Sequence, residues 1–483
     1  MNQFFISHGD VLFDIPRIAF ARFDQCEPVD LVDAKEAVLA FSAVSADWYA
    51  EQTQDIYSLA TDSPAPELWE QYWGTLFNKN NNNLPFNDPY GKMPLLRYEI
   101  RINAANDNFN RYREIVENEK VWLRIISNPQ STLEADVYGN LFGVAQTTTV
   151  SFKKVESHEA RVLSSTFDMD TWPDASLDEL KTALTTHKRA VALATFDVGQ
   201  GSSSALLDDK QMPWLYHDLG AGVTRNAHTT PIPLEFCWTN DPVIVLSHWD
   251  SDHWAGARKD SRALARTWIA PRQIIGATHT VFANDILLAG GRLLIWPQGI
   301  GLITIYNTWK QSFTVGRCTG KDRNGTCLAM RVDDDKSGAK LHWLLTGDGG
   351  YHQLPFKLYG DVAAMVVPHH GAKMSGNRHI PQRSKNTYAR LLFSFGPGNA
   401  HGPRSLSHPT QSAVYAHELH GWNLGTWKNK SHPGDTLAGG DVLATAQHVS
   451  THLSGSIAGW KSAPTPNHRP CGKASCTTDI KQF

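Results

Sequence analysis

Apolar residues form short continuous runs along roughly the last three fifths of the chain. Continuous runs of strand length are typical of strands that are buried on both faces. Residues 261–266 and similar segments between the runs suit helices. This alternation predicts an α/β fold in which helices cover sheets. The runs lie at residues 191–196, 243–246, 341–345, 362–367 and 391–395.

The N-terminal part of the chain has a different pattern. Apolar positions at helical spacing predict helices over residues 31–51 and 67–76. The segments 121–126 and 137–150 favour strands. We expect an additional α+β module here, followed by an amphipathic linker helix over residues 174–189.

The densest group of chemically active side chains follows the apolar run at 243–246. His248, Asp250, Asp252 and His253 place two imidazoles and two carboxylates within six residues. Burying such groups without partners costs on the order of several kcal/mol, because they lose their hydration. A metal site explains the cluster better than the alternative, a polar and solvated turn.

Two later segments offer further ligands. Asp348 follows the run at 341–345, and its two carboxylate oxygens can bridge two ions. One of His369 and His370, which follow the run at 362–367, can complete a second coordination sphere. Two metal ions about 3.5–4 Å apart lower the pKa of a shared water and stabilise both reacting oxygens. Because this ligand set is rich in carboxylates, we expect two divalent ions that are either Zn²⁺ or Mn²⁺.

Five short motifs occur in a fixed order within residues 191–450. They are Asp197-Val198-Gly199-Gln200-Gly201, Asp218-Leu219-Gly220, the segment 248–253, Leu344-Leu345-Thr346-Gly347-Asp348, and His369-His370-Gly371. This order resembles the metallo-β-lactamase superfamily, and in particular the hydrolase domain of the competence DNA-uptake protein ComEC. The resemblance implies a four-layer αββα sandwich with the site at one edge, metal-dependent hydrolysis, and nuclease activity. It also implies that Asp252 orients the attacking hydroxide.

The chain departs from the superfamily pattern at four places. Asp250 stands where the commonest cluster has a second His, an exchange that also occurs in the ComEC-like branch. Ser202 replaces the Asp that follows Gly-Gln-Gly, which puts any role of that carboxylate in doubt. Ala372 replaces a Ser. Residues 324–328 contain no His, although the ordinary superfamily has a ligand there; the ComEC-like branch tends to have Asn, as Asn324 is here.

Three further residues are secondary candidates. Asp218 suits a hydrogen bond to a ligand histidine, with a plain turn carboxylate as the alternative. Asp197 lies in a strand-to-turn link, where a structural role is at least as plausible as a catalytic one. His408 resembles a family position that contacts substrate or the metal centre, and we expect a catalytic role; the alternative is a capping residue before a helix at 411–420.

Charge is distributed unevenly, although the whole chain has a net charge of only −3. Residues 1–190 hold 17 basic and 28 acidic side chains, whereas residues 191–483 hold 28 and 20. Residues 362–417 contain no acidic side chain at all. Basic residues beside a two-metal site suit a phosphate-bearing substrate, and incidental charge on a solvated loop is the alternative. Lys373, Arg378 and Arg383 are the candidates for binding phosphate.

Together these features predict a hydrolase that cleaves phosphodiester bonds, with DNA or RNA as the substrate. One alternative is hydrolysis of a small phosphodiester or cyclic nucleotide. A second is a non-catalytic accessory subunit of a multi-protein complex, and a carboxylic or lactam substrate also stays open because fold does not fix function.

The length and composition of the chain predict its domain organisation and its location in the cell. We expect an acidic N-terminal module at 1–190 that docks a protein partner or regulates the site, a hydrolase domain at 191–460, and a loosely ordered tail at 461–483. Six scattered cysteines do not make a disulfide framework. No signal peptide or membrane-spanning run is evident, so we expect a cytoplasmic protein with no membrane partner.

Overall fold

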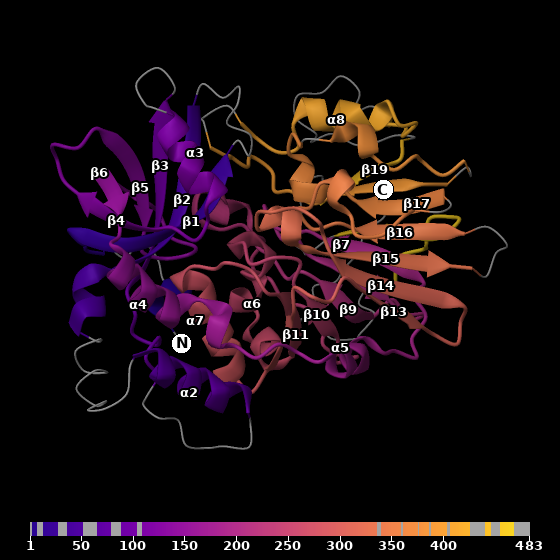
Figure 1. The fold of residues 1–483 in the computed structure, drawn as a ribbon. Coiled ribbons are helices and arrows are strands. Elements are labelled where there is room, and N and C mark those ends of the chain that lie inside the picture. The colour runs from indigo at the N-terminus through magenta and orange to yellow at the C-terminus, as the bar shows by residue number, and fades with distance from the viewer. Residues whose placement is uncertain are drawn as a thin grey trace. The chain divides into compact units, whose positions relative to one another are not determined.

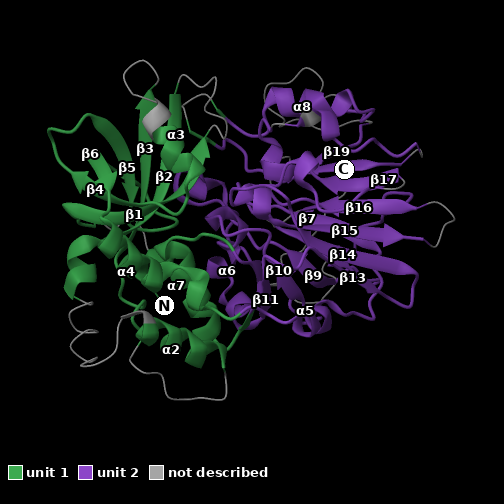
Figure 2. Cartoon of the chain, viewed as in Figure 1, with its two compact units in different colours: residues 1–173, 273–293, 400–406 green, residues 174–272, 294–399, 407–483 purple. Residues whose placement is uncertain are grey.

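The computed structural model describes most of the 483 residues. The described ranges are 2–6, 13–27, 36–51, 65–78, 88–103, 109–335, 340–358, 361–374, 376–385, 388–402, 406–425, 440–445 and 455–467. The chain divides into two compact units, which are coloured separately in Figure 2. Unit 1 comprises residues 1–173, 273–293 and 400–406, and unit 2 comprises the remainder.

Unit 1 contains a closed barrel of six antiparallel strands in the order β1-β2-β3-β5-β6-β4 (Figure 1). Its interior is filled by apolar side chains from every strand. Closure of the barrel leaves no unpaired sheet edge. The strands are β1 (Ile18–Glu27), β2 (Glu36–Ser45), β3 (Leu95–Asn103), β4 (Trp122–Ser127), β5 (Leu133–Tyr138) and β6 (Gln146–Lys154). The helices include α2 (Ala65–Phe77), α3 (Phe109–Glu117), α4 (Ser157–Phe167) and α7 (Ala277–Leu288), and residues 46–51, the end of the helix expected over 31–51, are also helical.

Predictions for the N-terminal part were correct only in places. The strand at 121–126 and the helix at 67–76 are confirmed as β4 and α2. The helix expected over 31–51 is wrong for residues 36–45, which form β2, while 31–35 lie outside the described residues. Eight consecutive residues of β2 are buried, so its apolar run reflects burial on both faces of a strand rather than one helical face.

The single strand expected over 137–150 is a hairpin instead. Strand β5 ends at Tyr138 and β6 begins at Gln146, and the two pair in an antiparallel register. The intervening segment contains Gly139 and Gly143, and a Cβ on Gly139 would overlap the ring of Phe13. The glycines therefore mark a turn inside a stretch that otherwise looks continuous.

Unit 2 is built on two seven-stranded sheets. In the first sheet, β9, β10 and β11 are parallel neighbours; in the second, β16, β17, β18 and β19 are. The first sheet has the order β12 (Arg292–Trp296), β11 (Thr267–Pro271), β10 (Val243–Val245), β9 (Pro213–His217), β8 (Ser204–Leu207), β7 (Ala192–Phe196) and β20 (Gly455–Ala458). The second has the order β13 (Leu302–Tyr306), β14 (Gln311–Arg317), β15 (Leu328–Asp334), β16 (Leu341–Leu345), β17 (Asp361–Val366), β18 (Arg390–Phe393) and β19 (Val442–Ala444).

The two sheets of unit 2 pack against each other around one hydrophobic cluster. That cluster takes Leu215 and Val245 from the first sheet and Val315 and Leu345 from the second. A second cluster lies on the other side of the second sheet and includes residues of α8 (Gln411–Glu418). The strands predicted from the five apolar runs are therefore confirmed. Both faces of the second sheet are buried at its central strands, whereas the edge strand β13 exposes one face.

Helices are short and few among the described residues of unit 2. They are α5 (Leu177–Leu184), α6 (Gly256–Lys259) and α8, with several 3₁₀ turns. Helix α5 occupies part of the linker helix expected over 174–189, and α8 agrees with the helix expected over 411–420. Ser176 caps α5, because its hydroxyl accepts from the backbone N–H of Glu179 and the Glu179 side chain returns to Ser176.

Two further expectations concern the tail and the membrane. Residues 468–483 of the expected tail lie outside the described residues, whereas the backbone N–H of Asn467 donates to Gln211 at 2.6 Å. None of the helices in the described part of the chain combines the length and the apolar character that a bilayer crossing requires.

Candidate metal centre

Three strand ends in unit 2 carry the candidate ligands. The segment 248–253 follows β10, Asp348 follows β16, and His369 and His370 follow β17. Strands β16 and β17 are parallel neighbours, so their carboxyl ends lie at the same edge of the sheet. The turn at Gly347 has φ +56°, and a Cβ there would lie 2.7 Å from the Ser247 side chain. Only glycine allows the loop that carries Asp348 to approach the segment after β10 so closely.

The structure brings the predicted ligands together into two groups that share Asp348. In the first group, Nε2 of His253 lies 3.2 Å from Oδ1 of Asp348. Nε2 of His370 lies 3.1 Å from Oδ2 of Asp252. All four side chains are buried. We call Asp252, His253, His370 and Oδ1 of Asp348 the first donor group.

The second donor group consists of His248, Asp250, His369 and Oδ2 of Asp348. Nε2 of His248 lies 3.4 Å from Oδ2 of Asp250 and 3.7 Å from Oδ2 of Asp348. Nε2 of His369 lies 3.7 Å from the same oxygen of Asp348. Oδ1 of Asp348 is thus close to His253, and Oδ2 is close to His248 and His369. The two groups adjoin, because donor atoms of His248, His253 and Asp348 also lie within 4.8 Å of one another.

The backbone that presents His369 and His370 is unusual. Their φ angles are +48° and +53°, in the left-handed region that residues with a Cβ seldom adopt. The neighbouring structure holds this conformation: the N–H of His369 donates to the carbonyl of Gly347 at 3.3 Å, and the N–H of Ala372 donates to the carbonyl of His369 at 2.7 Å. Such strain clusters at functional sites, where it fixes the direction of a side chain.

Hydrogen bonds behind the ligands fix the orientation of their rings. Nδ1 of His253 lies 2.8 Å from Asp218, which also accepts from the backbone N–H and the hydroxyl of Ser247 at 2.6 and 2.9 Å. Nδ1 of His370 donates to the carbonyl of Ser394 at 2.8 Å. Asp218 thus lies where a carboxylate supporting a ligand histidine is expected.

With their Nδ1 atoms held in this way, His253 and His370 direct their Nε2 atoms toward the carboxylates of the site. Because the Ser394 carbonyl can only accept, Nδ1 of His370 carries a ring proton, and Nε2 of the same ring lies 3.1 Å from Oδ2 of Asp252. Nε2 of His248 and of His253 are buried and have no hydrogen-bond partner within the described part of the chain. A divalent cation in each group would satisfy these atoms, so the residues present fit the metals that the sequence predicts.

The pKa of Asp348 is lowered and that of His253 is raised, and both directions indicate that the carboxylates of the site favour positive charge beside them. Burial raises the pKa of Asp348, but nearby His253, His369 and His248 outweigh it and hold the pKa well below its usual range. Burial lowers the pKa of His253, but Asp348, Asp218 and Asp252 outweigh it and hold that pKa well above its usual value. Without metal ions, protons on the histidines would have to supply the charge that balances the carboxylates.

Asp250 has an additional partner that the sequence did not reveal. Its Oδ1 accepts from Nη1 of Arg323 at 2.8 Å, and both side chains are buried, at 5% and 2% exposure. Arg323 directly precedes the 3₁₀ turn Asn324–Thr326. The two residues are 73 positions apart, and nothing in the local sequence distinguishes Arg323 from a surface arginine.

The turn that contains Asp197 supports the ligands through its backbone. The N–H of Ser202 donates to the carbonyl of Asp252 at 3.0 Å, and the carbonyl of Gly201 accepts from the hydroxyl of Ser394 at 2.7 Å. Asp197 itself accepts from the N–H of Gly199 at 3.2 Å, and burial raises its pKa to about 7. Its described contacts are those of a turn residue.

His408 lies beside the second donor group. Its ring centroid is 5.6 Å from that of His369. Asn399 fixes the His408 backbone, donating to its carbonyl at 2.7 Å and accepting from its N–H at 2.8 Å. The residue that caps α8 is Thr410, not His408, because the Thr410 hydroxyl accepts from the N–H of Ala413.

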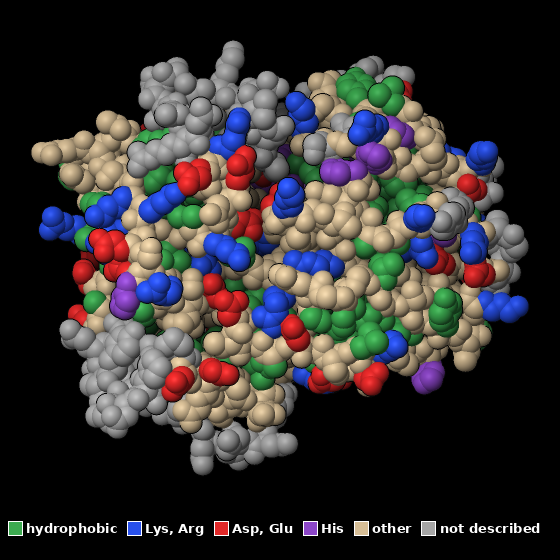
Figure 3. Space-filling model, in the orientation of Figure 1, with side chains coloured by type: hydrophobic (Ala, Val, Ile, Leu, Met, Phe, Trp, Pro, Cys, Tyr) green, Lys and Arg blue, Asp and Glu red, His purple; other side chains and the backbone are tan. Residues whose placement is uncertain are grey.

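The three predicted phosphate-binding residues differ in their surroundings. Lys373 and Arg378 are exposed. Arg383 instead forms a two-pronged ion pair with Asp441 at 2.7 and 3.0 Å. On the face drawn in Figure 3, basic and acidic side chains are interspersed rather than gathered by sign.

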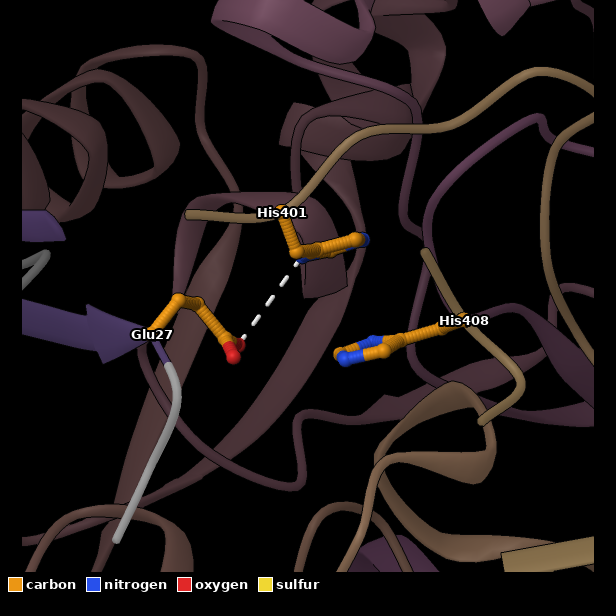
Figure 4. Close-up of side chains that lie close together, drawn as sticks. All are labelled: Glu27, His401 and His408. Carbon is orange, nitrogen blue, oxygen red and sulfur yellow. Dashed lines mark ion pairs between the residues drawn. The ribbon is translucent and has the colours of Figure 1, made fainter. Parts of the chain in front are cut away.

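A separate acid–histidine contact occurs in unit 1. Nδ1 of His401 lies 3.8 Å from Oε1 of Glu27, and both side chains are buried (Figure 4). The third side chain in that figure, His408, belongs to unit 2 and is described above with His369.

Comparison with known proteins gives limited likenesses. No family model and no curated protein matches the chain. Human tRNase Z, short form, matches 42% of this chain and 92% of its own at 14% identity and a TM-score of 0.25. Zn²⁺-bound PqqB from Methylobacterium extorquens matches 41% of this chain and 68% of its own at 14% identity and a TM-score of 0.22. Likenesses this distant carry no weight for function, which has to be inferred from the side chains of the site.

Proposed function

We propose that this protein is a metallo-β-lactamase-type hydrolase that binds two divalent cations and cleaves phosphodiester bonds, with DNA or RNA as its substrate. The observation that carries the proposal is the position of Asp348. One of its oxygens faces His253 and the other faces His248 and His369, at 3.2 and 3.7 Å. A buried carboxylate with a set of nitrogens on each side is the arrangement that holds two cations side by side.

Two sheets that share one core, with α8 on the far side of the second, support the four-layer sandwich that the motif order implies. Two divalent cations at such a site lower the pKa of a water molecule and stabilise the charge that develops on the attacked phosphorus centre. The first donor group has two carboxylates and two imidazoles, a mixed set that suits Zn²⁺ or Mn²⁺.

Side chains of the protein would orient the nucleophile, donate a proton and bind the substrate phosphates. Asp252 would orient the nucleophile through Oδ1, because its Oδ2 faces Nε2 of His370. His408, whose ring lies 5.6 Å from that of His369, would donate a proton to the leaving oxygen or hold the phosphate. Lys373 and Arg378 offer exposed positive charge for a polyanionic substrate, which favours a nucleic acid over a neutral amide or lactam.

The experiment is a metal analysis joined to a cleavage assay on the full chain. Labelled single- and double-stranded DNA and RNA are incubated with Mn²⁺, Mg²⁺ or Zn²⁺, beside a cyclic nucleotide and bis(p-nitrophenyl) phosphate. We expect about two ions per chain, cleavage of a polymer, and a loss of about 10³-fold or more in Asp252→Ala. Asp333→Asn is the matched control, because Asp333 is a carboxylate of the same unit that contacts His342 at 2.6 Å outside both donor groups.

Three results would count against the proposal. Equal cleavage by Asp252→Ala would remove the catalytic assignment. Turnover of only the small esters would move the substrate class to small phosphodiesters. A folded protein that binds no divalent cation would end the proposal altogether.

A further inference from the structure

Arg323 gives the two donor groups opposite electrostatic surroundings. Its guanidinium is 2% exposed and lies 2.8 Å from Oδ1 of Asp250, which belongs to the second group. The first group has the reverse neighbour, because the carboxylate of Asp218 lies 2.8 Å from Nδ1 of its ligand His253. Asp218 reaches His248 of the second group only through the Ser247 hydroxyl, which lies 2.9 Å from Asp218 and 3.0 Å from Nδ1 of His248. The direct ionic neighbour is therefore an anion for the first group and a cation for the second.

The donor atoms of Asp250 show the same asymmetry. Oδ1 is engaged by Arg323, so Oδ2, which lies 3.4 Å from Nε2 of His248, is the oxygen directed toward the other donors. A carboxylate that already neutralises a guanidinium attracts a second cation less strongly. In the first group, by contrast, Asp218 makes the His253 ring a better donor.

We propose that Arg323 sets the affinity of the second donor group, so that the two cations bind in order: tightly at the first group, then more weakly at the second. This inference rests on the proposed two-metal function. Arg323 acts on the site through Asp250 and is a positioning residue. The weaker site is the one at which the supply of metal would control activity.

The physical basis is the positive charge of the Arg323 guanidinium, which persists at every accessible pH and which salt screens only weakly. An arginine side chain stays protonated at every accessible pH, so its repulsion of a divalent cation is constant. Because Arg323 and Asp250 are both buried, salt in the solvent weakens this repulsion little. The interaction of charges a few ångströms apart in such surroundings is large enough to change a binding constant by about tenfold or more.

The test is a titration of the chelator-treated full chain with Mn²⁺, followed by calorimetry and by the electron paramagnetic resonance signal of Mn²⁺. In the native sequence we expect two binding steps that differ at least about tenfold in affinity. Arg323→Gln keeps a hydrogen-bond donor but removes the charge, and should tighten the second step by about tenfold while leaving the first unchanged. Arg323→Lys keeps the charge and should retain the weak second step.

Asp218→Asn is the matched variant for the other group. It removes the anion behind His253, so it should weaken the first step by about tenfold or more and leave the second step in place. Circular dichroism of each metal-free variant checks that it is folded, and if Arg323→Gln does not fold, Arg323→Met takes its place as the uncharged variant.

The outcomes separate this inference from the proposed function. Two equal binding steps in the native sequence, an unchanged second step in Arg323→Gln, or a tightened one in Arg323→Lys would each overturn the role of Arg323 and leave the two-metal hydrolase standing. A single bound ion, or none, would instead overturn the two-metal function on which the inference rests.

Discussion

Unit 1 and unit 2 each bury a cluster of charged groups, but only one of the clusters balances itself. In unit 1, Asp24 pairs with Arg97 and lies 2.7 Å from Nε2 of His279. Its carboxylate therefore meets a permanent cation and a ring nitrogen that can donate. In unit 2, Asp252 and Asp348 meet imidazoles whose ring protons are directed elsewhere or whose Nε2 atoms have no hydrogen-bond partner within the described residues.

This difference separates a structural ion pair from a ligand set. Both clusters contain histidine and aspartate at short distances, and composition alone would treat them alike. What distinguishes them is whether each buried acceptor faces a donor, because a buried acceptor that faces another acceptor needs a cation between them. The carboxylate of Asp24 faces a guanidinium and a ring nitrogen that can donate, whereas among the described residues the carboxylates of Asp252 and Asp348 face only imidazole nitrogens, which is why we propose cations in the second cluster alone.

The largest effect should come from removing the shared ligand of the incomplete cluster. Asp348→Ala takes an oxygen from both donor groups, so we expect loss of at least one bound ion and a fall in hydrolysis of about 10³-fold or more. Metal content by mass spectrometry and a cleavage assay measure the two effects. If the variant keeps both ions, the comparison between the clusters is wrong at its central residue.

The complementary change is in unit 1, where we expect a loss of stability and no loss of metal. Asp24→Asn removes one of the two buried carboxylates that pair with the Arg97 guanidinium and leaves only Glu99, so we expect a loss of about 1–3 kcal/mol. Urea unfolding measures the loss, and metal analysis of the folded variant should match the native protein. A drop in bound metal would show that the Asp24 cluster is not a purely structural pair.

The sequence indicated which residues of one cluster lie together and left the other cluster unnoticed, for a physical reason. His248, Asp252, Asp348 and His370 each follow an apolar run, so a strand-end site could be expected from the order of residues alone. Arg323 could not, because its partner lies 73 residues away and the contact depends on how two loops fold together.

Prediction of the fold is also limited where the structure depends on residues that are far apart in the sequence. Short apolar runs in the second half of the chain gave strands correctly, because those strands are buried in sheets. The same kind of run at 36–45 predicts a helix from its spacing, and only the pairing of β2 with β1 and β3 identifies it as a strand inside a sheet.

Asp197 represents a third kind of buried carboxylate, with neither a cation nor a second donor group in its described contacts. Burial raises its pKa to about 7, so the folded protein holds its proton where an unfolded chain, with a pKa near 3.8, has lost it. Its stabilising contribution is complete below the unfolded pKa and is lost as pH rises to about 7, a change on the order of 4 kcal/mol. Asp197→Asn should therefore gain stability relative to the native protein between pH 4 and about 7. Urea unfolding at both pH values, in chelator, measures the difference, and a constant difference would contradict the assignment.

The smallest expected effects concern the basic side chains around the site. Arg383 is already paired with Asp441, so Arg383→Ala should lower stability without changing the salt dependence of nucleic-acid binding. Arg378 is exposed, so Arg378→Ala should raise the KM for a polymer about two- to fivefold and reduce the salt slope by about one phosphate contact. Hydrolysis of bis(p-nitrophenyl) phosphate, which is too small to reach an outlying cation, should stay unchanged in both variants and serves as the control. If Arg383→Ala changes the salt slope and Arg378→Ala does not, then phosphate binding depends on the paired cation, and exposure is the wrong criterion for choosing among these three residues.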